Sequence, residues 1–479
     1  MTRPRRWRAR LAALVVVAAV AVPVAVAVQP TVAAASPGAL DPSFGTGGLV
    51  TTTMSAGGTD VVNAVATQSD GKIVAVGYDQ PLGGVQRFAV ARYNTNGTLD
   101  SSFGTGGTVT TAIAGVNGNG DAALAVALQS NGKIVVGGYT SSLSGGTATE
   151  EMALVRYNTN GGLDTGFGTS GIATAVAGTN VFTNRINGLA IDGSGRIVVA
   201  GQYDNGWVVG RFATTGALDT TFASGGAQPG FQLSFPSAVN PTDNAYAVAI
   251  QPADHKVVVS GSANANADFG VGRLDTDGTL DTSFGSGGVV DTPVGGTAGT
   301  AFGVAVQGNG NIVAAGQSGD DNGGDHLSVA LTRYTGTGAL DSSFGTGGIV
   351  TTPLGTQDAA GHGVALQSDG RIVVGGYFQA AVSANDLAVL RYNTDGSLDS
   401  SFGTGGASLV NTGGADDFGN AVALEPGSLG AIVVAGSDQP SGGSPQFLLA
   451  RFLAASAPTV TSISPTSGPQ TGGTSVVIT

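Results

Sequence analysis

One short phrase, Leu-Asp-x-x-Phe-Gly or a close variant, recurs along the chain and constrains its fold more than any other feature. Successive copies are separated by about 60 residues, and self-similarity at a fixed period is the signature of a repeat architecture. The chain is therefore an array of one structural unit. The copies begin at Leu40, Leu99, Leu163, Leu218, Leu280, Leu340 and Leu398.

Each unit carries four signals for a short strand. A small-residue strand such as 64–66 is followed by a tight Asp-Gly or Asn-Gly turn, which favours a hairpin. The second strand, such as 73–76, is a continuous apolar run typical of strands covered on both faces. The third strand ends in Arg followed by Tyr, Phe or Leu, and a fourth, such as 108–111, follows the phrase. Four short antiparallel strands repeated around a ring form a β-propeller.

The two ends of the array indicate how the ring closes. The array opens at Leu40 with only the phrase and the fourth strand, and it ends at Arg451 with only the first three strands. The first piece can thus complete the last unit. We predict an all-β, seven-bladed β-propeller over residues 38–453, in which residues 40–53 complete the blade that begins near Asn420.

The sequence of the repeat also resembles a known family. Residues 366–406, which read LQSDGRIVVGGY at their start and LDSSFGTGG at their end, are similar to the bacterial delta-60 repeat family, and the similarity extends over residues 38–453. This resemblance implies a propeller-like exported or surface protein and brings no established activity. After a linker at 454–458, residues 459–479 resemble the first strand and hairpin of a TIG (IPT) domain, an immunoglobulin-like module. Such a sandwich needs about 100 residues, so we expect this segment to be an incomplete domain.

Residues 1–35 have the pattern of a cleaved signal peptide. A basic head of five arginines precedes an apolar run at 11–28, and small residues at 33–35 supply a cleavage site. A membrane anchor is the alternative, but Pro23 and the Ala-rich exit favour cleavage. We therefore expect a secreted or cell-surface protein with no membrane span after cleavage.

Composition excludes several classes of function. Five of the 19 basic residues lie in the leader. The rest of the chain has 14 basic and 32 acidic residues, which gives a net charge of −18. Nucleic acid requires clustered Lys and Arg, and we predict that it is not a partner. Cysteine is absent, which rules out disulfides, thiolate catalysis and cysteine-bound zinc. We expect a monomer without a cofactor.

An Arg and an Asp recur eight residues apart in nearly every unit. A ring of ligand-binding charges is one interpretation, but a structural pair that caps a Gly-rich turn accounts better for a constant repeat. We interpret them as structural. The clearest pairs are Arg92 with Asp100, Arg156 with Asp164, Arg273 with Asp281, and Arg391 with Asp399.

The turn that contains Asp275, Asp277 and Asp281 resembles part of a calcium loop. The first ligand of such a loop would fall on Arg273, a cation where calcium needs an anionic oxygen. Calcium therefore remains a minor alternative, and we predict no metal site at this turn.

The residue just before each innermost strand varies far more than the scaffold around it. These positions would ring the mouth of the channel on the rim with irregular loops, and functional residues concentrate in such loops. Aromatic, amide and imidazole groups together suit sugar or peptide recognition. The predicted ligand-binding residues are Asn63, Asn187, Tyr246, Phe302, His362 and Asn420, with Leu124 at the remaining position and the carboxylates Asp60, Asp121, Asp243 and Asp417 three residues earlier in four of the units.

Three hypotheses for the function follow. The first is an exported binding or interaction module that recognises a glycan, a peptide or a surface protein on the variable rim. The second is a propeller lyase or hydrolase in which His362 is the general base, helped by Asp358 or Asp417. The third is a structural or adhesive surface protein, whose channel would be filled by side chains.

Overall fold

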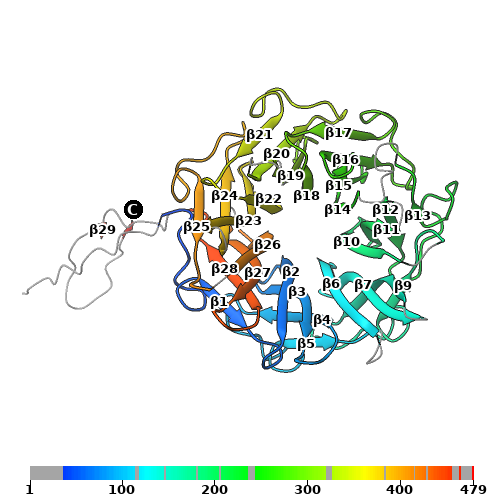
Figure 1. The fold of residues 1–479 in the computed structure, drawn as a ribbon, viewed down its shortest axis with the longest axis horizontal. Helices are drawn as coiled ribbons and strands as arrows, with labels where there is room; N and C mark the ends of the chain where they lie inside the picture. The colour runs from blue at the N-terminus through cyan, green and yellow to red at the C-terminus, as the bar shows by residue number, and fades with distance from the viewer. Residues whose placement is uncertain are drawn as a thin grey trace, which may run out of the picture. The chain divides into compact units, whose positions relative to one another are not determined.

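The computed structural model is a ring of seven four-stranded antiparallel sheets (Figure 1). It describes residues 36–113, 118–144, 147–179, 182–203, 206–235, 243–319, 326–381, 384–414, 416–427, 430–455, 463–464 and 477–478. The seven-bladed propeller predicted from the repeat is confirmed. The predicted signal peptide lies outside the described residues, as does most of the TIG-like segment, where only β29 (Ile463–Ser464) and β30 (Val477–Ile478) are described and pair antiparallel.

The first four blades each contain four consecutive strands, with the innermost strand first in the chain. Their bounds are β2 (Thr59–Thr67), β3 (Ile73–Gln80), β4 (Arg87–Tyr93) and β5 (Thr108–Thr111) in blade 1; β6 (Gly118–Leu128), β7 (Ile134–Ser144), β8 (Thr147–Tyr157) and β9 (Ile172–Ala175) in blade 2; β10 (Asn184–Ile191), β11 (Ile197–Tyr203), β12 (Gly206–Phe212) and β13 (Phe231–Gln232) in blade 3; and β14 (Ala245–Ile250), β15 (Val257–Ala263), β16 (Asp268–Leu274) and β17 (Val289–Pro293) in blade 4.

Blades 5 and 6 repeat this order, whereas blade 7 takes its outermost strand from the beginning of the chain (Figure 1). In blade 7, β1 pairs antiparallel with β28 from Leu49 opposite Ala450 to Thr52 opposite Phe447. The bounds are β18 (Thr300–Val306), β19 (Ile312–Ser318), β20 (Ser328–Tyr334) and β21 (Ile349–Thr352) in blade 5; β22 (Ala359–Leu366), β23 (Ile372–Ala381), β24 (Ala384–Tyr392) and β25 (Ala407–Val410) in blade 6; and β26 (Asp416–Leu424), β27 (Ile432–Gln439), β28 (Gln446–Phe452) and β1 (Leu49–Thr52) in blade 7.

The hydrophobic core lies between neighbouring blades. One cluster, for example, joins Val313 and Leu331 of blade 5 to Val374 and Leu390 of blade 6, and all four side chains are fully buried. The apolar runs of the second and third strands are buried on both faces for this reason. In the described part of the chain, no helix is long and apolar enough to cross a membrane.

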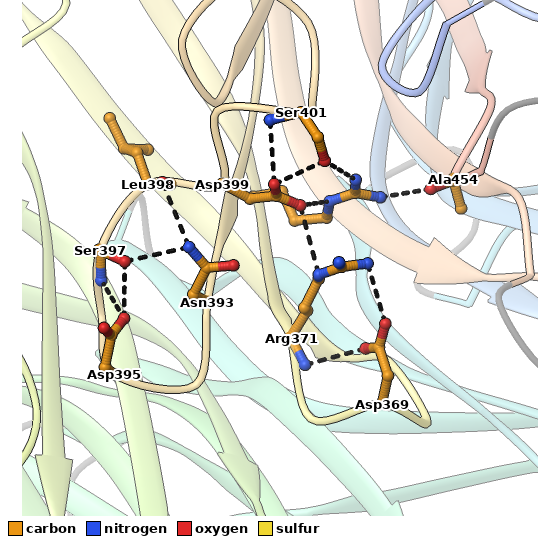
Figure 2. Close-up of polar contacts among 10 residues, drawn as sticks. Asp369, Arg371, Asn393, Asp395, Ser397, Leu398, Asp399, Ser401 and Ala454 are labelled. Carbon is orange, nitrogen blue, oxygen red and sulfur yellow. Dashed lines mark hydrogen bonds and ion pairs between the residues drawn. The ribbon is translucent and has the colours of Figure 1, made fainter.

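Arginine and aspartate of the repeat form the same polar cluster in every blade. Arg391 Nε donates to Asp399 Oδ2 at 2.8 Å, and Asp399 Oδ1 accepts from the main chain and hydroxyl of Ser401 (Figure 2). The guanidinium of Arg391 lies over the ring of Phe402 at 4.5 Å. Equivalent pairs are Arg92 with Asp100, Arg156 with Asp164, Arg211 with Asp219, Arg273 with Asp281, Arg333 with Asp341 and Arg451 with Asp41.

This cluster also joins one blade to the next. Arg92 Nη1 donates to the main-chain oxygen of Thr159 in blade 2 at 2.5 Å, and Arg391 reaches Ala454 beyond blade 7 in the same way (Figure 2). Burial alone would raise the pKa of Asp100, but hydrogen bonds from Ser102 and Lys72 hold that pKa well below its usual range. The repeated phrase and its arginine therefore link each blade to the next.

Candidate ligand cavity

The seven variable positions meet in one cavity on the channel side of the ring. The cavity has a volume of about 540 Å³. It is lined at these positions by Asn63, Leu124, Asn187, Tyr246, Phe302, His362 and Asn420, one from the innermost strand of each blade. The structure thus brings together the residues that the sequence predicted to ring the channel mouth, but it places them within the innermost strands and not just before them. Whether they bind a ligand stays a prediction.

A β-bulge places each of these side chains. The pairing of the innermost strand with the second shifts by one residue in every blade, for example between Val62 and Ala64 in blade 1 and between Gly361 and Gly363 in blade 6. The residue skipped by the shift is the cavity residue itself, Asn63 or His362. A bulge leaves its extra residue outside the ladder and re-aims its side chain. The scaffold therefore points seven side chains at one space without constraining their chemistry.

Several cavity side chains also connect neighbouring blades. Asn63 Nδ2 donates to the main-chain oxygen of Ala123 at 2.8 Å, and Asn187 and Asn420 make the same bond to Ala245 and Val62. Each acceptor precedes the bulge residue of the next blade. One N–H of each amide is thereby committed to the scaffold, whereas Asn63 and Asn187 retain Oδ1 as an acceptor.

The opposite wall of the cavity is aromatic. Tyr246, Phe302 and His362 contact one another edge to face, with ring centroids 4.9 and 5.0 Å apart. The series continues from His362 to Tyr377 and then to Phe418, with 5.4 Å between centroids at each step. Blades 4, 5 and 6 thus contribute rings to the cavity wall, and blades 7, 1 and 3 contribute amides. The cavity has two chemically different sides.

One charged residue of the cavity wall was not predicted. Arg185 in β10 lines the cavity, forms two bonds of 2.6 Å to the carboxylate of Glu150, and lies over the ring of Tyr139 at 4.5 Å. A signal existed in the sequence, because Arg185 and Arg87 are the only basic residues after the leader that fall outside the two repeated basic positions. Glu150 offsets the charge of Arg185, so the wall carries little net charge.

His362 faces the cavity without a carboxylate partner. Its Nδ1 lies 3.1 Å from the main-chain oxygen of Gly419, which fixes the proton on Nδ1 and leaves Nε2 as the basic nitrogen. Burial lowers the pKa of His362, against smaller opposing effects of the Gly419 and Asn420 hydrogen bonds. The imidazole is therefore uncharged at neutral pH.

The two aspartates expected to assist His362 have other partners. Asp358 Oδ1 accepts from the main chain of Leu327 at 2.9 Å and lies 3.4 Å from Nδ1 of His326. Asp417 Oδ2 accepts from the main chain and hydroxyl of Thr412. The geometry of the described residues thus provides His362 with no acid, and it does not favour the lyase or hydrolase hypothesis.

The carboxylates three residues before the bulges serve the loops and do not line the cavity. Asp60 Oδ2 accepts from the main chain of Met54, Asp121 Oδ2 from Ile113, and Asp243 Oδ1 from Asn266. All three aspartates are buried. A buried carboxylate that accepts main-chain N–H bonds orders a loop. Their proximity to the cavity in sequence therefore does not make them ligand groups.

The turn that resembles a calcium loop already contains a cation, the side chain of Lys256. The ammonium of Lys256 lies 3.0 Å from Asp275 Oδ1 and 2.7 Å from Asp281 Oδ2, and Asp277 accepts from the main chain and hydroxyl of Thr279. The carboxylates of this turn are therefore already paired. In the described ranges, no group of three or more His, Cys, Asp or Glu side chains is arranged to hold a metal ion.

Asp60 faces a second carboxylate, and this makes stability depend on pH. Burial raises the pKa of Asp60 to about 6, and Asp79 adds to this, because Asp79 lies opposite Asp60 in the strand pair. A folded pKa above the unfolded value of 3.8 favours folding at low pH, and this stability is lost as pH rises from about 4 to about 6. Asp417, opposite Asp438 in blade 7, shows the same direction.

We therefore expect Asp60→Asn to stabilise the protein at pH 7.5 by about 1–3 kcal/mol and at pH 4.5 by about a third of that amount. The new amide keeps an acceptor for Met54 and offers a donor to Asp79. Urea unfolding at the two pH values measures the difference. The matched control is Asp121→Asn, because the residue opposite Asp121 in the strand pair is Thr140, which donates to Asp121 Oδ1 at 2.6 Å, where Asp60 has Asp79. An equal gain in both variants would contradict this explanation.

The comparisons with known proteins concern the scaffold. Five segments match the family model described as a domain of unknown function (DUF5122) beta-propeller, at residues 68–103, 129–167, 193–222, 253–284 and 367–402. The chain is a β-propeller repeat protein. All five segments end at the repeated phrase, and none includes a cavity residue. No curated protein matches the sequence.

Solved structures with similar folds differ widely in sequence. A Dyadobacter fermentans protein of unknown function is 11% identical with a TM-score of 0.44, and the alignment covers 86% of this chain and 100% of that one. A Lactobacillus plantarum protein is 15% identical with a TM-score of 0.41, covering 83% and 98%. The polysaccharide lyase Uly1 is 10% identical with a TM-score of 0.42, covering 82% and 90%.

Proposed function

We propose that this protein is a binding module whose ligand, an uncharged carbohydrate, enters the cavity lined by the seven bulge residues. The single observation that carries the proposal is the convergence of these side chains on one space with an aromatic and an amide side. Its volume of about 540 Å³ lies within the usual range for small-ligand sites. A purely structural channel would be filled by side chains.

The chemistry of the walls selects the ligand class. A sugar ring has an apolar face that packs on aromatic side chains and hydroxyls that need acceptors. Tyr246, Phe302 and His362 supply the rings, and Asn63 and Asn187 retain acceptor oxygens. Because Glu150 offsets Arg185 and His362 is uncharged at neutral pH, a charged ligand would find no counter-charge.

A glycan array at pH 7, followed by calorimetry on the ligands it identifies, tests the proposal. We expect Tyr246→Ala and Phe302→Ala to weaken binding about 10-fold each, because an aromatic contact contributes about 1 kcal/mol or more beyond its buried area. Phe182→Ala is the matched control, since that ring is 59% exposed and does not line the cavity. Unchanged affinity in both cavity variants, with their folding intact, would place the ligand elsewhere.

A further inference from the structure

Two adjacent blades carry a pair of aspartates that face each other across the two innermost strands. Asp60 lies opposite Asp79 in blade 1, and Asp417 lies opposite Asp438 in blade 7. All four residues are buried, and Asp417 is only 1% exposed. Two buried carboxylates in contact are unfavourable unless a positive charge or a proton offsets them.

Blade 1 places an offsetting charge beside its pair, and the described residues of blade 7 place none there. Arg87 lies opposite Asp79 in the next strand, and its Nε and Nη2 are both 2.6 Å from Asp79 Oδ2. The corresponding position opposite Asp438 is Gln446. In blade 7, Thr412 donates to Asp417 through its main chain and hydroxyl and to Asp438 through its hydroxyl, and no basic side chain is among the described partners of the pair.

The surroundings of the blade 7 pair add further negative charge. Asn411, next to Thr412, donates to Asp386 Oδ1 at 2.9 Å, and Asp386 is also buried. Asp416 accepts from the main chain and side chain of Asn385. None of these aspartates has a basic side chain among its described partners. This corner of the ring therefore concentrates uncompensated carboxylates.

The oxygens of the pair converge on one point. Asp438 Oδ1, the main-chain oxygen of Gln439 and Asp417 Oδ1 lie 2.7, 2.7 and 3.0 Å from the position that a Cβ would take at Gly414. Asp417 Oδ1 is buried and has no hydrogen-bond partner in the described structure. Only glycine fits at position 414, because any side chain there would meet all three oxygens. A buried acceptor without a partner requires an explanation, and a bound ion is one that these oxygens would suit.

We propose that this cradle in blade 7 binds a hard divalent cation, calcium in preference to magnesium. Carboxylate, main-chain and hydroxyl oxygens are the donors that calcium takes, with water completing its coordination, whereas magnesium demands a stricter octahedron. Asp417, Asp438 and Gln439 would supply the protein oxygens, and Thr412 lies beside them. Asp417 adjoins Phe418, whose ring contacts Tyr377 at 5.4 Å. The ion would therefore hold the innermost strand of the closing blade next to the cavity.

Calorimetry and thermal unfolding test this inference on the full chain after dialysis against EGTA. We expect one Ca²⁺ to bind with a Kd in the range of about 10⁻⁵ to 10⁻³ M, tighter than Mg²⁺. At ten times Kd, the midpoint of unfolding should rise by about 1–2 °C. Asp438→Asn should weaken binding at least 10-fold, and Gly414→Ala should do the same while keeping both carboxylates.

Gln446→Arg is the decisive variant, because it gives blade 7 the arginine that blade 1 has. It should abolish Ca²⁺ binding and raise the unfolding midpoint of the EGTA-treated protein, which a variant that merely damages the fold would not do. Asp60→Asn in blade 1 should leave Ca²⁺ affinity unchanged. No heat of binding in the unaltered protein, or equal affinity in Gln446→Arg and the unaltered protein, would overturn the proposal in favour of a shared proton.

Discussion

Removal of residues 36–52 should abolish cooperative folding of the propeller. Strand β1 would be lost from blade 7, and β28 would become an open edge, which is a template for aggregation. Arg451 would lose Asp41, its partner at 3.0 Å, and the fully buried ring of Phe44 beneath it. The loss of a buried aromatic ring alone costs about 3–5 kcal/mol, and Arg451 would keep only Glu425, at 3.1 Å, as an acidic partner. Circular dichroism, calorimetry and gel filtration would measure the outcome.

A circular permutant provides the matched control for this deletion. Gly38 donates to the main-chain oxygen of Leu453 at 2.7 Å, so residues 36 and 455 can be joined by a short Gly-Ser linker. New termini can be placed at the exposed tip next to Leu82, which is 83% exposed. This permutant keeps every strand and should fold like the original chain. If the deletion variant unfolds at the same temperature as the permutant, the first segment does not close the ring.

Loss of a repeat aspartate should be nearly as severe. We expect Asp399→Ala to reduce the free energy of unfolding by about 3–5 kcal/mol, because it leaves the guanidinium of Arg391 buried without a counter-charge. The same change also removes the acceptor for the main chain and hydroxyl of Ser401 (Figure 2). Urea unfolding measures the loss, with the slope of the transition as a check on two-state behaviour.

Two further variants separate charge from packing at this cluster. Asp395→Ala removes an aspartate that bonds to Ser397 in the same pattern but lies exposed on the turn, so its effect should be far smaller (Figure 2). The double variant Arg391→Met with Asp399→Ala should recover part of the stability lost in Asp399→Ala, because it removes the stranded charge. A double variant less stable than Asp399→Ala would show that the arginine contributes mainly through its contacts with Phe402 and Ala454.

The sequence predicted the blades well because the signals for them are local. Asp70-Gly71 and its equivalents fix hairpins between neighbouring strands, and the Arg–Asp spacing of eight residues spans one turn. The bond from Arg92 to Thr159 could not be predicted, since its acceptor is a main-chain oxygen in the next blade. Main-chain acceptors carry no residue-type signal.

The candidate cavity was predicted in position but not in detail. Variation at Tyr246, Phe302 and His362 indicated where the cavity lies, yet nothing in the amino-acid sequence indicated a β-bulge at each of these positions. Bulges arise from the packing of innermost strands around the axis, which is a tertiary property. Grouping Asp417 with the cavity for its nearness in sequence was the error, because its side chain is buried against Thr412 and Asp438.

The amino-acid sequence by itself determined the number of blades, their strand order and the closure of the ring, because each follows from hairpins and periodic apolar runs within about 60 residues. Only the tertiary structure decided which side chains meet. The amide of Asn63 donates to the main chain of blade 2, and the carboxylate of Glu150 pairs with Arg185. Asp417 lies opposite Asp438, at a place where blade 7 has Gln446 and blade 1 has an arginine. These relations depend on distances between blades and between paired strands, which the repeat leaves unspecified.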